Sequence, residues 1–375
     1  MNRRQLLKTG PSGLVGLLSA PYLLGAPKPA PDPCTCTSIE EMIRLCCNEN
    51  PYGPSPLARE AIQQSIRKGN RYPRRLHRSL KEQLAEYHSL SPDHFLIGSG
   101  SAQILQLIAL WLGMEQKHIL SADNTFAWMM KYAAQFGSQW TKVPLDENQY
   151  FDLPTLRQAA SNHEGLVYLC NPNNPTGTYL GPERVEPFCR SIAARQPLLV
   201  DEAYIEYLEG GESESAIAWI KELPQLMVCR TFSKLYGMAG LRVGYLVAHP
   251  ERIKELEALE AGFGMNVSAT SLAAASASLK DEEFRQSSRI QTQSVRQFVQ
   301  AQLEEWNVPM ADASANFVFC NVDHIKGDLK AALKDENFQL WPFEHNGQKV
   351  LRLTIGSKEE MEQFCQKMQP HFTNS

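Results

Sequence analysis

Short apolar runs that each end in a polar turn recur through the middle of this chain. Residues 95–98, 165–170 and 196–200 are such runs, and they alternate with stretches of helical character. Parallel strands need long crossover connections, and these are usually helices that cover the sheet. The sequence therefore predicts an α/β fold with a mostly parallel central sheet that is covered on both faces.

Length and composition are those of a globular protein with two domains. The chain has 375 residues, of which 43% are hydrophobic and 21% are charged. We expect a large domain over residues 70–265 and a smaller α+β domain made of residues 39–69 and 266–375. The formal net charge of -4 gives no electrostatic reason to expect nucleic acid as a partner.

The N-terminus is typical of an export signal with a linker, over residues 1–33. Arg3, Arg4 and Lys8 precede a mildly apolar stretch that is too short to cross a bilayer as a mature helix. The paired arginines resemble a twin-arginine signal, which directs the export of folded proteins. We expect a periplasmic or otherwise exported protein with no membrane span in the mature chain. The alternative is a basic tail on a cytoplasmic protein.

Cysteine usage leaves the compartment open. There are nine cysteines, so at least one lies outside any intramolecular pair. Cys170 and Cys229 lie in apolar runs and are predicted to be buried thiols. Four others cluster near the mature start and could pair after export: Cys34, Cys36, Cys46 and Cys47. They lack a second Cys or His pair at zinc spacing, so zinc is the weaker alternative and we predict no metal site.

One lysine, Lys234, lies in a turn between strand-like runs at residues 226–229 and 241–248. Burying an ammonium group without a partner costs several kcal/mol, so packing does not explain a lysine here. Its presence is explained if the amine is consumed in a Schiff base with an aldehyde cofactor. Arg242 would then bind an anionic group of that cofactor. The alternative is a solvated loop lysine near a structural arginine.

Three further turns carry polar groups to strand ends. The segment GSGS at residues 98–101 joins a strand to a helix expected over residues 102–112, and a helix N-terminus binds anions. The loop at residues 171–177 places amide side chains at the carboxyl edge of the sheet, where open α/β sheets bind ligands. Asp201 follows the next strand and is either a helix cap or the partner of a protonated ring nitrogen.

Seven segments together resemble the fold-type I pyridoxal-phosphate aminotransferases, most closely their histidinol-phosphate aminotransferase branch. The resemblance covers about residues 48–356. It rests on NENPYG at 48–53, RYP at 71–73, GSGS at 98–101, NPNNPTG at 171–177, DEAY at 201–204, Ser233-Lys234 with Arg242, and LRLTIG at 351–356. It implies a large domain that binds pyridoxal 5′-phosphate.

The resemblance assigns roles to the residues around that cofactor. Lys234 would carry it and later move a proton at the substrate's Cα. Asp201 would keep the pyridine nitrogen protonated, which makes the ring an electron sink. Asn174 and Tyr204 would bind the ring's phenolate oxygen. The phosphate would be held by Arg242, Ser233, Thr231 and the backbone N–H groups of Ser101 and Ala102.

Other assignments concern the partner subunit and the substrate. The resemblance implies a homodimer in which Tyr72 reaches the neighbouring subunit's phosphate. It also implies substrate contacts from Arg352, Asn316 and Tyr52, with Arg352 clamping a carboxylate through its fork of donors. The chain departs from the family at Ala102, which is usually Asp. It departs again at Met129, the position aligned with the aromatic residue that stacks on the ring, and we expect Trp128 to take that part.

The resulting expectation is an aminotransferase that moves an amino group between an amino acid or amino compound and a 2-oxo acid. Alternatives are histidinol-phosphate aminotransferase proper, a decarboxylase of the same branch, and a protein that binds small amino compounds without turnover. Trp341 aligns with an arginine that helps to bind the substrate's phosphate in the branch. An indole has one donor and no charge, so we expect a neutral or aromatic donor to be preferred.

Overall fold

The computed structural model of this protein describes residues 42–260, 265–345 and 347–373. Its largest sheet has the strand order β2-β8-β7-β6-β5-β3-β4. All neighbouring strands are parallel except that β8 runs antiparallel to both β2 and β7. This confirms the predicted α/β class with a mostly parallel sheet. The strands are β2 (Phe95–Gly98), β3 (His118–Ala122), β4 (Trp140–Val143), β5 (Gly165–Cys170), β6 (Leu198–Asp201), β7 (Leu226–Thr231) and β8 (Gly244–Ala248).

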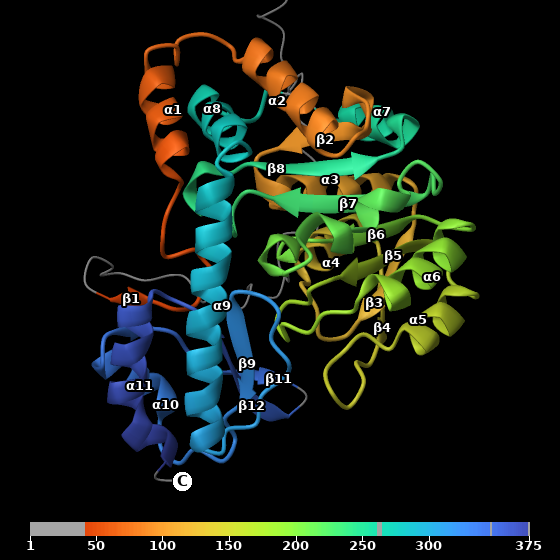
Figure 1. The fold of residues 1–375 in the computed structure, drawn as a ribbon. Coiled ribbons are helices and arrows are strands. Elements are labelled where there is room, and N and C mark those ends of the chain that lie inside the picture. Colours follow the sequence, from red (N-terminus) through yellow and green to blue (C-terminus); the bar gives the residue numbers. More distant parts are fainter. Residues whose placement is uncertain (1–41, 261–264, 346, 374–375) are drawn as a thin grey trace, which may run out of the picture. The chain divides into compact units, whose positions relative to one another are not determined.

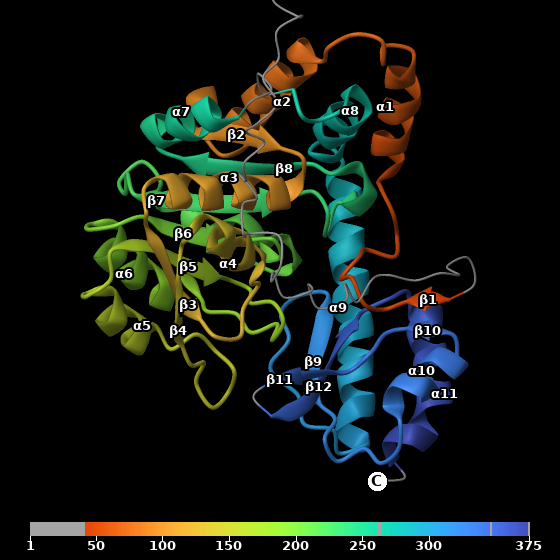
Figure 2. The same cartoon turned by 180° about the vertical axis from the view of Figure 1, so that it is seen from behind.

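Helices pack against this sheet. Helix α3 contacts β2, β7 and β8, whereas α5 contacts β3 and β4, and α6 contacts β6. Figures 1 and 2 show the sheet from opposite sides, with α3 and α4 in front of the strands in Figure 2. The helices are α2 (Arg74–Tyr87), α3 (Gly100–Met114), α4 (Trp128–Ala133), α5 (Leu153–Ala160), α6 (Pro182–Ala193) and α7 (Pro250–Leu259). Short 3₁₀ helices are η1 (Pro92–His94), η2 (Ala134–Phe136), η3 (Ile205–Tyr207), η4 (Gly211–Glu214), η5 (Ala216–Trp219) and η6 (Ala239–Leu241).

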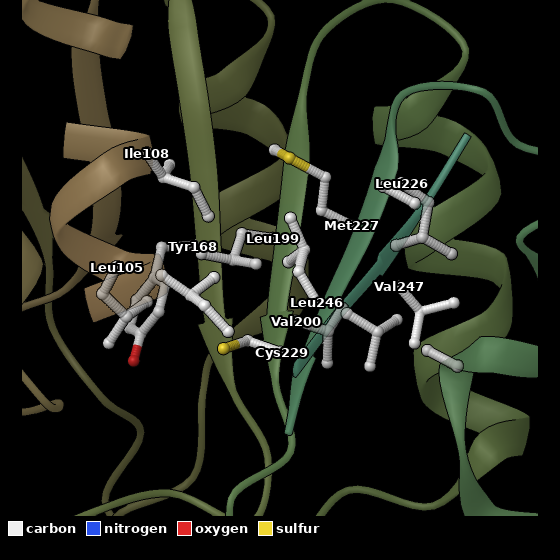
Figure 3. Packing of buried hydrophobic residues seen from close by; sticks show 14 of the residues in the cluster. Leu105, Ile108, Tyr168, Leu199, Val200, Leu226, Met227, Cys229, Leu246 and Val247 are labelled. Atoms are coloured by element: carbon white, nitrogen blue, oxygen red, sulfur yellow. The ribbon is translucent and has the colours of Figure 1, made fainter. Parts of the chain in front are cut away.

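The central strands of the sheet are buried because both faces are covered, whereas the edge strand β4 is partly exposed. Every residue of β5, β6 and β7 is buried. Figure 3 shows their side chains packed with those of α3. Cys170 and Cys229 are both buried, as predicted. Each large aliphatic side chain buried here contributes about 1.5–3 kcal/mol, and this core fixes the strand ends that carry polar residues.

A second hydrophobic cluster lies in the C-terminal part of the chain and includes Leu45. It surrounds a three-stranded antiparallel sheet of order β11-β12-β9, and β1 pairs in parallel with β10. The elements are β1 (Ile43–Arg44), α9 (Glu282–Glu305), β9 (Phe317–Asn321), α10 (Leu329–Asp335), β10 (Phe338–Gln339), β11 (Phe343–His345), β12 (Gln348–Thr354) and α11 (Lys358–Thr373).

Helices α1 (Pro56–Ile66) and α8 (Ala269–Ser278) pack against each other. Ala58 of α1 and Leu272 of α8 belong to the larger cluster, together with the central sheet. The division into residues 70–265 and residues 39–69 with 266–375 stays a prediction. The packing of α1 and α8 favours giving both helices to the larger part.

Some predicted bounds differ from the observed ones. The strand predicted over residues 241–248 begins at Gly244, because residues 239–241 form η6 and Arg242 has a left-handed backbone with a φ of 53°. Helix α3 begins at Gly100 rather than at Ala102. Within the described ranges, no helix is both long and apolar enough to cross a membrane. The predicted export signal, Cys34 and Cys36 lie outside the described residues.

Candidate active site

The polar residues predicted for the site meet at one edge of the central sheet. Asp201 ends β6, Lys234 follows β7 and Asn174 follows β5. These three strands are parallel, so their carboxyl ends lie together. The N-terminus of α3 reaches the same edge, because β2 runs antiparallel to β8 and Gly98 pairs with Gly244.

Lys234 lies inside the site and is turned toward the N-terminal segment. Its Nζ donates to the carbonyl oxygens of Cys47 and Asn48, both at 3.1 Å. The same atom lies 5.5 Å from the ring centre of Tyr204. Burial, followed by the charge of Arg352, lowers the pKa of Lys234 to about 8. A larger share of the amine is therefore neutral near neutral pH than in an exposed lysine, and only the neutral amine is nucleophilic.

Asp201 is a buried carboxylate, 2% exposed. The Tyr168 hydroxyl donates to its Oδ2 at 2.9 Å, and the backbone N–H of Ala203 donates to its Oδ1 at 3.2 Å. Burial raises the pKa of Asp201 to about 6, against the effect of these two donors. The carboxylate is thus mostly ionised at pH 7 and can accept a hydrogen bond from a ring nitrogen.

Tyr204 is held by two amide side chains. Its hydroxyl oxygen accepts from Asn174 Nδ2 at 3.2 Å and from Asn48 Nδ2 at 3.0 Å. Asn48 is also bound to Thr354 of β12. Burial raises the pKa of Tyr204, so the phenol is neutral. Because its oxygen already accepts two hydrogen bonds, its proton is available to donate to an anionic oxygen.

The start of α3, the Ser233 side chain and Arg242 form an anion cradle. Arg242 Nη1 donates to Ser233 Oγ at 3.2 Å and to the carbonyl oxygen of Ala239 at 3.0 Å. A Cβ at Gly100 would collide with the Arg242 guanidinium, and one at Gly244 would collide with the Ser101 nitrogen. Both glycines are therefore needed to bring the guanidinium and the free N–H groups of the α3 N-terminus close together.

Three other predicted residues adjoin this cradle. Thr231 Oγ1 accepts from the backbone N–H of Ser233 at 3.1 Å. Ser101 and Ala102 lie in the first turn of α3, where backbone N–H groups lack helical acceptors. The side chain at position 102 is not needed for such a backbone contact, so Ala102 is compatible with the cradle.

Arg352 of β12 connects the site to the C-terminal sheet. Its Nη1 donates to Asn174 Oδ1 and its Nη2 donates to the carbonyl oxygen of Cys46, both at 2.7 Å. Its Nε is buried and has no hydrogen-bond partner among the described residues. The nearby Asn316 donates to the carbonyl oxygen of Glu49 at 3.2 Å. Two of the five guanidinium N–H donors are used in these bonds, so the fork is still suited to binding a carboxylate.

A cavity of about 470 Å³ is lined by residues that include Thr354, which bonds to Asn48, and Ala239, which accepts from Arg242; Glu49, Asn50, Gly356 and Glu360 also line it. Tyr52 follows Asn50 in the same loop, and its backbone N–H donates to the Asn50 side chain at 3.0 Å. Burial, followed by the charges of Glu359 and Glu360, raises the pKa of Tyr52. The cavity is large enough for a small substrate.

Two predicted residues do not join this constellation. Tyr72 is 80% exposed and precedes α2. Trp128 is 57% exposed at the start of α4. Phe126 lies in the loop just before α4, is half-buried and packs against the larger hydrophobic cluster. Phe126 was not predicted for the site. It follows Thr125, whose Oγ1 donates to Asn173 Oδ1 in the 171–177 loop at 2.9 Å.

A buried ion cluster lies behind the site and was not predicted. Arg230 is 0% exposed, and its Nε donates to Glu202 Oε2 at 2.8 Å. Its Nη1 contacts Glu212 at 2.9 Å and Glu206 at 3.2 Å. The cluster ties the end of β7 to the segment that carries Tyr204. Removing Arg230 would leave its buried carboxylate partners without their counter-charge, at a cost of about 3–5 kcal/mol. In the sequence, the signals that could have revealed this cluster were Glu202 and Glu206, in and just after the DEAY segment, and Arg230 before Thr231.

The fold and the site define a class of enzyme. An amine with a lowered pKa, a buried carboxylate, a neutral phenol and an anion cradle lie at one edge of a mostly parallel sheet. These donors fit a phosphorylated pyridine aldehyde, and the unused donors of Arg352 fit the carboxylate of a substrate beside it. The class is that of α/β enzymes that depend on such a cofactor.

Comparison with known proteins gives the family. The sequence model of aminotransferase class I and II matches residues 40–368. A histidinol-phosphate aminotransferase of Halalkalibacterium halodurans is 32% identical over 350 residues, covering 91% of this chain and 93% of that protein. Histidinol-phosphate aminotransferase 2 of Pseudomonas fluorescens is 33% identical over 328 residues, covering 87% of this chain and 88% of that protein.

A solved structure has the same fold. The histidinol-phosphate aminotransferase of Sinorhizobium meliloti, crystallised with pyridoxal-5′-phosphate, aligns with a TM-score of 0.81 at 24% identity, covering 89% of this chain and 91% of that one. The chain belongs to the class I and II aminotransferase family. It is a fold-type I transaminase that uses pyridoxal 5′-phosphate to move an amino group between an amino compound and a 2-oxo acid.

Proposed function

We propose that Lys234 is the covalent anchor and proton carrier of this transaminase. The placement of Lys234, Asp201 and Asn174 at one sheet edge carries this proposal, with Asn174 hydrogen-bonded to both Tyr204 and Arg352. Bound pyridoxal phosphate withdraws electrons from the substrate's Cα. The neutral amine of Lys234 would move the proton between the substrate's Cα and the cofactor's C4′. Asp201 holds the ring nitrogen's proton.

The other predicted residues bind and orient. Tyr204 and Asn174 hold the ring oxygen, and Arg352 aligns the substrate's carboxylate. Because Arg352 also donates to Asn174, a movement of Arg352 at the substrate's carboxylate would also move the amide that binds the ring oxygen. Asn316 and Tyr52 line the substrate side. The phosphate is held by Arg242, Ser233, Thr231, Ser101 and Ala102.

One aromatic residue covers the cofactor's ring. Trp128 is the predicted candidate. Because Trp128 is largely exposed, the half-buried Phe126 is a second candidate. Stacking on an aromatic ring contributes about 0.5–1.5 kcal/mol beyond the area buried, or up to roughly tenfold in cofactor affinity. The affinity for pyridoxal 5′-phosphate is measured in Trp128→Ala and in Phe126→Ala, and the variant that binds the cofactor more weakly identifies the stacking residue. Unchanged affinity in Trp128→Ala would show that Trp128 does not stack on the ring.

The preferred amino donor is proposed to be a neutral or aromatic amino acid. Trp341 lies between β10 and β11, is half-buried and stands outside the hydrophobic core. Its indole has one donor and no charge, so it cannot bind a phosphate as a guanidinium does. The names of the two relatives favour histidinol phosphate instead. In that case Arg74, Arg75 or Arg78, which are exposed on α2, would supply the charge.

Donor preference is tested by kcat/KM for histidinol phosphate and for neutral and aromatic amino acids, with 2-oxoglutarate as acceptor. The wild type should prefer a neutral or aromatic donor. Trp341→Arg should raise kcat/KM for the phosphorylated donor by about one to two decades, since each charge-assisted hydrogen bond contributes about 1.5–3 kcal/mol. Met114→Arg, at the far end of α3, is the control for added charge.

Two outcomes of that comparison would change the account. A wild type that clearly prefers histidinol phosphate would refute the role of Trp341 and support histidinol-phosphate aminotransferase proper. Release of CO₂ in place of a 2-oxo acid product would identify the decarboxylase alternative, because the same electron sink serves either bond at Cα.

A homodimer is proposed, with Tyr72 completing the partner's site. Its high exposure supports this assignment. The protein should sediment as a dimer. Mixing Tyr72→Phe and Lys234→Ala chains under exchange conditions should restore activity, since each mixed dimer holds one complete site. A monomer, or no recovery on mixing, argues against the shared site.

Export through the twin-arginine route is proposed from Arg3 and Arg4. The cytoplasmic alternative predicts no change in location when these residues are altered. Replacing both with lysine should leave the protein in the cytoplasmic fraction while its activity in lysate is unchanged. Normal export of that double variant would exclude this route.

A further inference from the structure

The surroundings of Asp201 contain few hydrogen-bond donors. Its Cα partners across the sheet are Cys170 on β5 and Cys229 on β7. Burial raises the pKa of both thiols well above the usual range, so both are neutral and donate weakly. The described contacts of the carboxylate are the backbone N–H of Ala203 and the hydroxyl of Tyr168. Tyr168 is therefore its one side-chain donor among the described residues.

Strand register explains how Tyr168 reaches that carboxylate. Tyr168 pairs with Leu199, two residues before Asp201, so the three side chains point to the same face of the sheet. A diagonal neighbour on the next strand is about 7–8 Å away, which an aromatic side chain can span. Figure 3 shows the Tyr168 side chain among Leu105, Leu199 and other packed residues. The ring is fully buried, so its hydroxyl is held in place.

We propose that Tyr168 is a positioning residue that keeps the Asp201 carboxylate ionised and turned toward the cofactor's ring nitrogen. This inference rests on the proposed role of Asp201. A hydrogen bond to a charged group favours the ionised form by about ten- to a hundredfold. Without the Tyr168 hydroxyl, the carboxylate would stay buried but would lose the hydrogen bond that most opposes the effect of burial on its pKa. It would then take up a proton near neutral pH.

Other charged groups near Asp201 do not replace that hydroxyl. The charge of Lys234 favours the ionised form from the end of β7, and the charge of Glu202, next on β6, opposes it. The two thiols on the flanking strands are neutral, and Tyr204 is a neutral phenol. The residues of α3 that pack against this part of the sheet, such as Leu105, are apolar and carry no charge. Among the groups that favour the ionised carboxylate, the Tyr168 hydroxyl therefore has the largest effect, ahead of the Ala203 N–H and the charge of Lys234.

The test compares cofactor binding by the full-length wild type, Tyr168→Phe and Tyr245→Phe. Tyr245 is the matched control, because it is buried in the same sheet and its hydroxyl bonds to His88, away from Asp201. Equilibrium dialysis gives the Kd for pyridoxal 5′-phosphate between pH 5 and 9. In Tyr168→Phe the loss of affinity on acidification should begin about one to two pH units higher than in the wild type, with equal affinity at pH 9. Tyr245→Phe should follow the wild type.

Two results would overturn the proposal. One is a pH profile in Tyr168→Phe that matches the wild type, and the other is a constant loss of affinity at every pH, which a packing defect would cause. Thermal melting of each variant checks that the fold is kept. The variant Asp201→Asn tests the proposed role of Asp201 separately from that of Tyr168. If that variant binds the cofactor with wild-type affinity and pH dependence, the role of Asp201 itself is wrong.

Discussion

Lys234→Ala is expected to lower the rate of transamination by about four orders of magnitude or more. The substitution removes the amine that bonds to the cofactor's aldehyde and the base that moves the proton at Cα, and general acid–base catalysis alone contributes about 10²–10⁴-fold. The lowered pKa of Lys234, about 8, makes this amine the suitable nucleophile. Single-turnover rates with a saturating amino donor measure the loss.

Its control is Lys254→Ala, an exposed lysine on α7. That variant should retain wild-type rates. Lys234→Ala should also remain folded, because the side chain's contacts are two hydrogen bonds to backbone carbonyl oxygens rather than a buried ion pair. Near-wild-type turnover by Lys234→Ala would mean that another group performs the proton transfer.

Arg352→Ala is expected to lower kcat/KM for amino acids by about two to four decades. The variant loses a forked guanidinium that would make two charge-assisted hydrogen bonds to the substrate's carboxylate, each contributing about 1.5–3 kcal/mol. It also loses the hydrogen bond to Asn174 at 2.7 Å, so the hold on the ring oxygen weakens as well. Steady-state kinetics over a range of donor concentrations measures both effects.

Arg352→Lys and Arg190→Ala give the comparison. The lysine keeps the charge and loses the planar fork, so it should recover part of the loss. Arg190 forms exposed ion pairs with Glu186 and Glu222, and its removal should leave kcat/KM unchanged. Amines without a carboxylate should lose much less than amino acids do in Arg352→Ala, because only the weakened hold on the ring oxygen affects them. If Arg352→Ala affected both donor types alike, Arg352 would have no role in carboxylate binding.

The strands and their polar ends could be predicted because each carries a local signal. The run at residues 165–170 is apolar throughout, since both faces of the sheet are covered, and the loop at 171–177 follows it at once. Lys234 and Asp201 stand out as charged groups at the ends of such runs. The start of β8 was predicted wrongly because apolar Leu241 continues the pattern, although it belongs to η6.

Contacts that depend on register or on distant parts of the chain could not be predicted. Arg352 and Asn174 are 178 residues apart, and no local pattern pairs them. Tyr168 resembles any strand aromatic until the register places its hydroxyl against Asp201. Arg230 looks like a solvated charge in the sequence, and its burial follows from the path of the segment after β6.

The central claim is that Lys234 forms the covalent bond to the cofactor. The most direct test treats wild-type enzyme, saturated with pyridoxal 5′-phosphate, with borohydride, which reduces the C=N bond and makes the attachment permanent. Digestion and mass spectrometry then locate the added mass. The account predicts one modified peptide, with the reduced cofactor on Lys234 and none on Lys221 or Lys254. A modification on another lysine, or an enzyme that releases all of its cofactor after reduction, would contradict it.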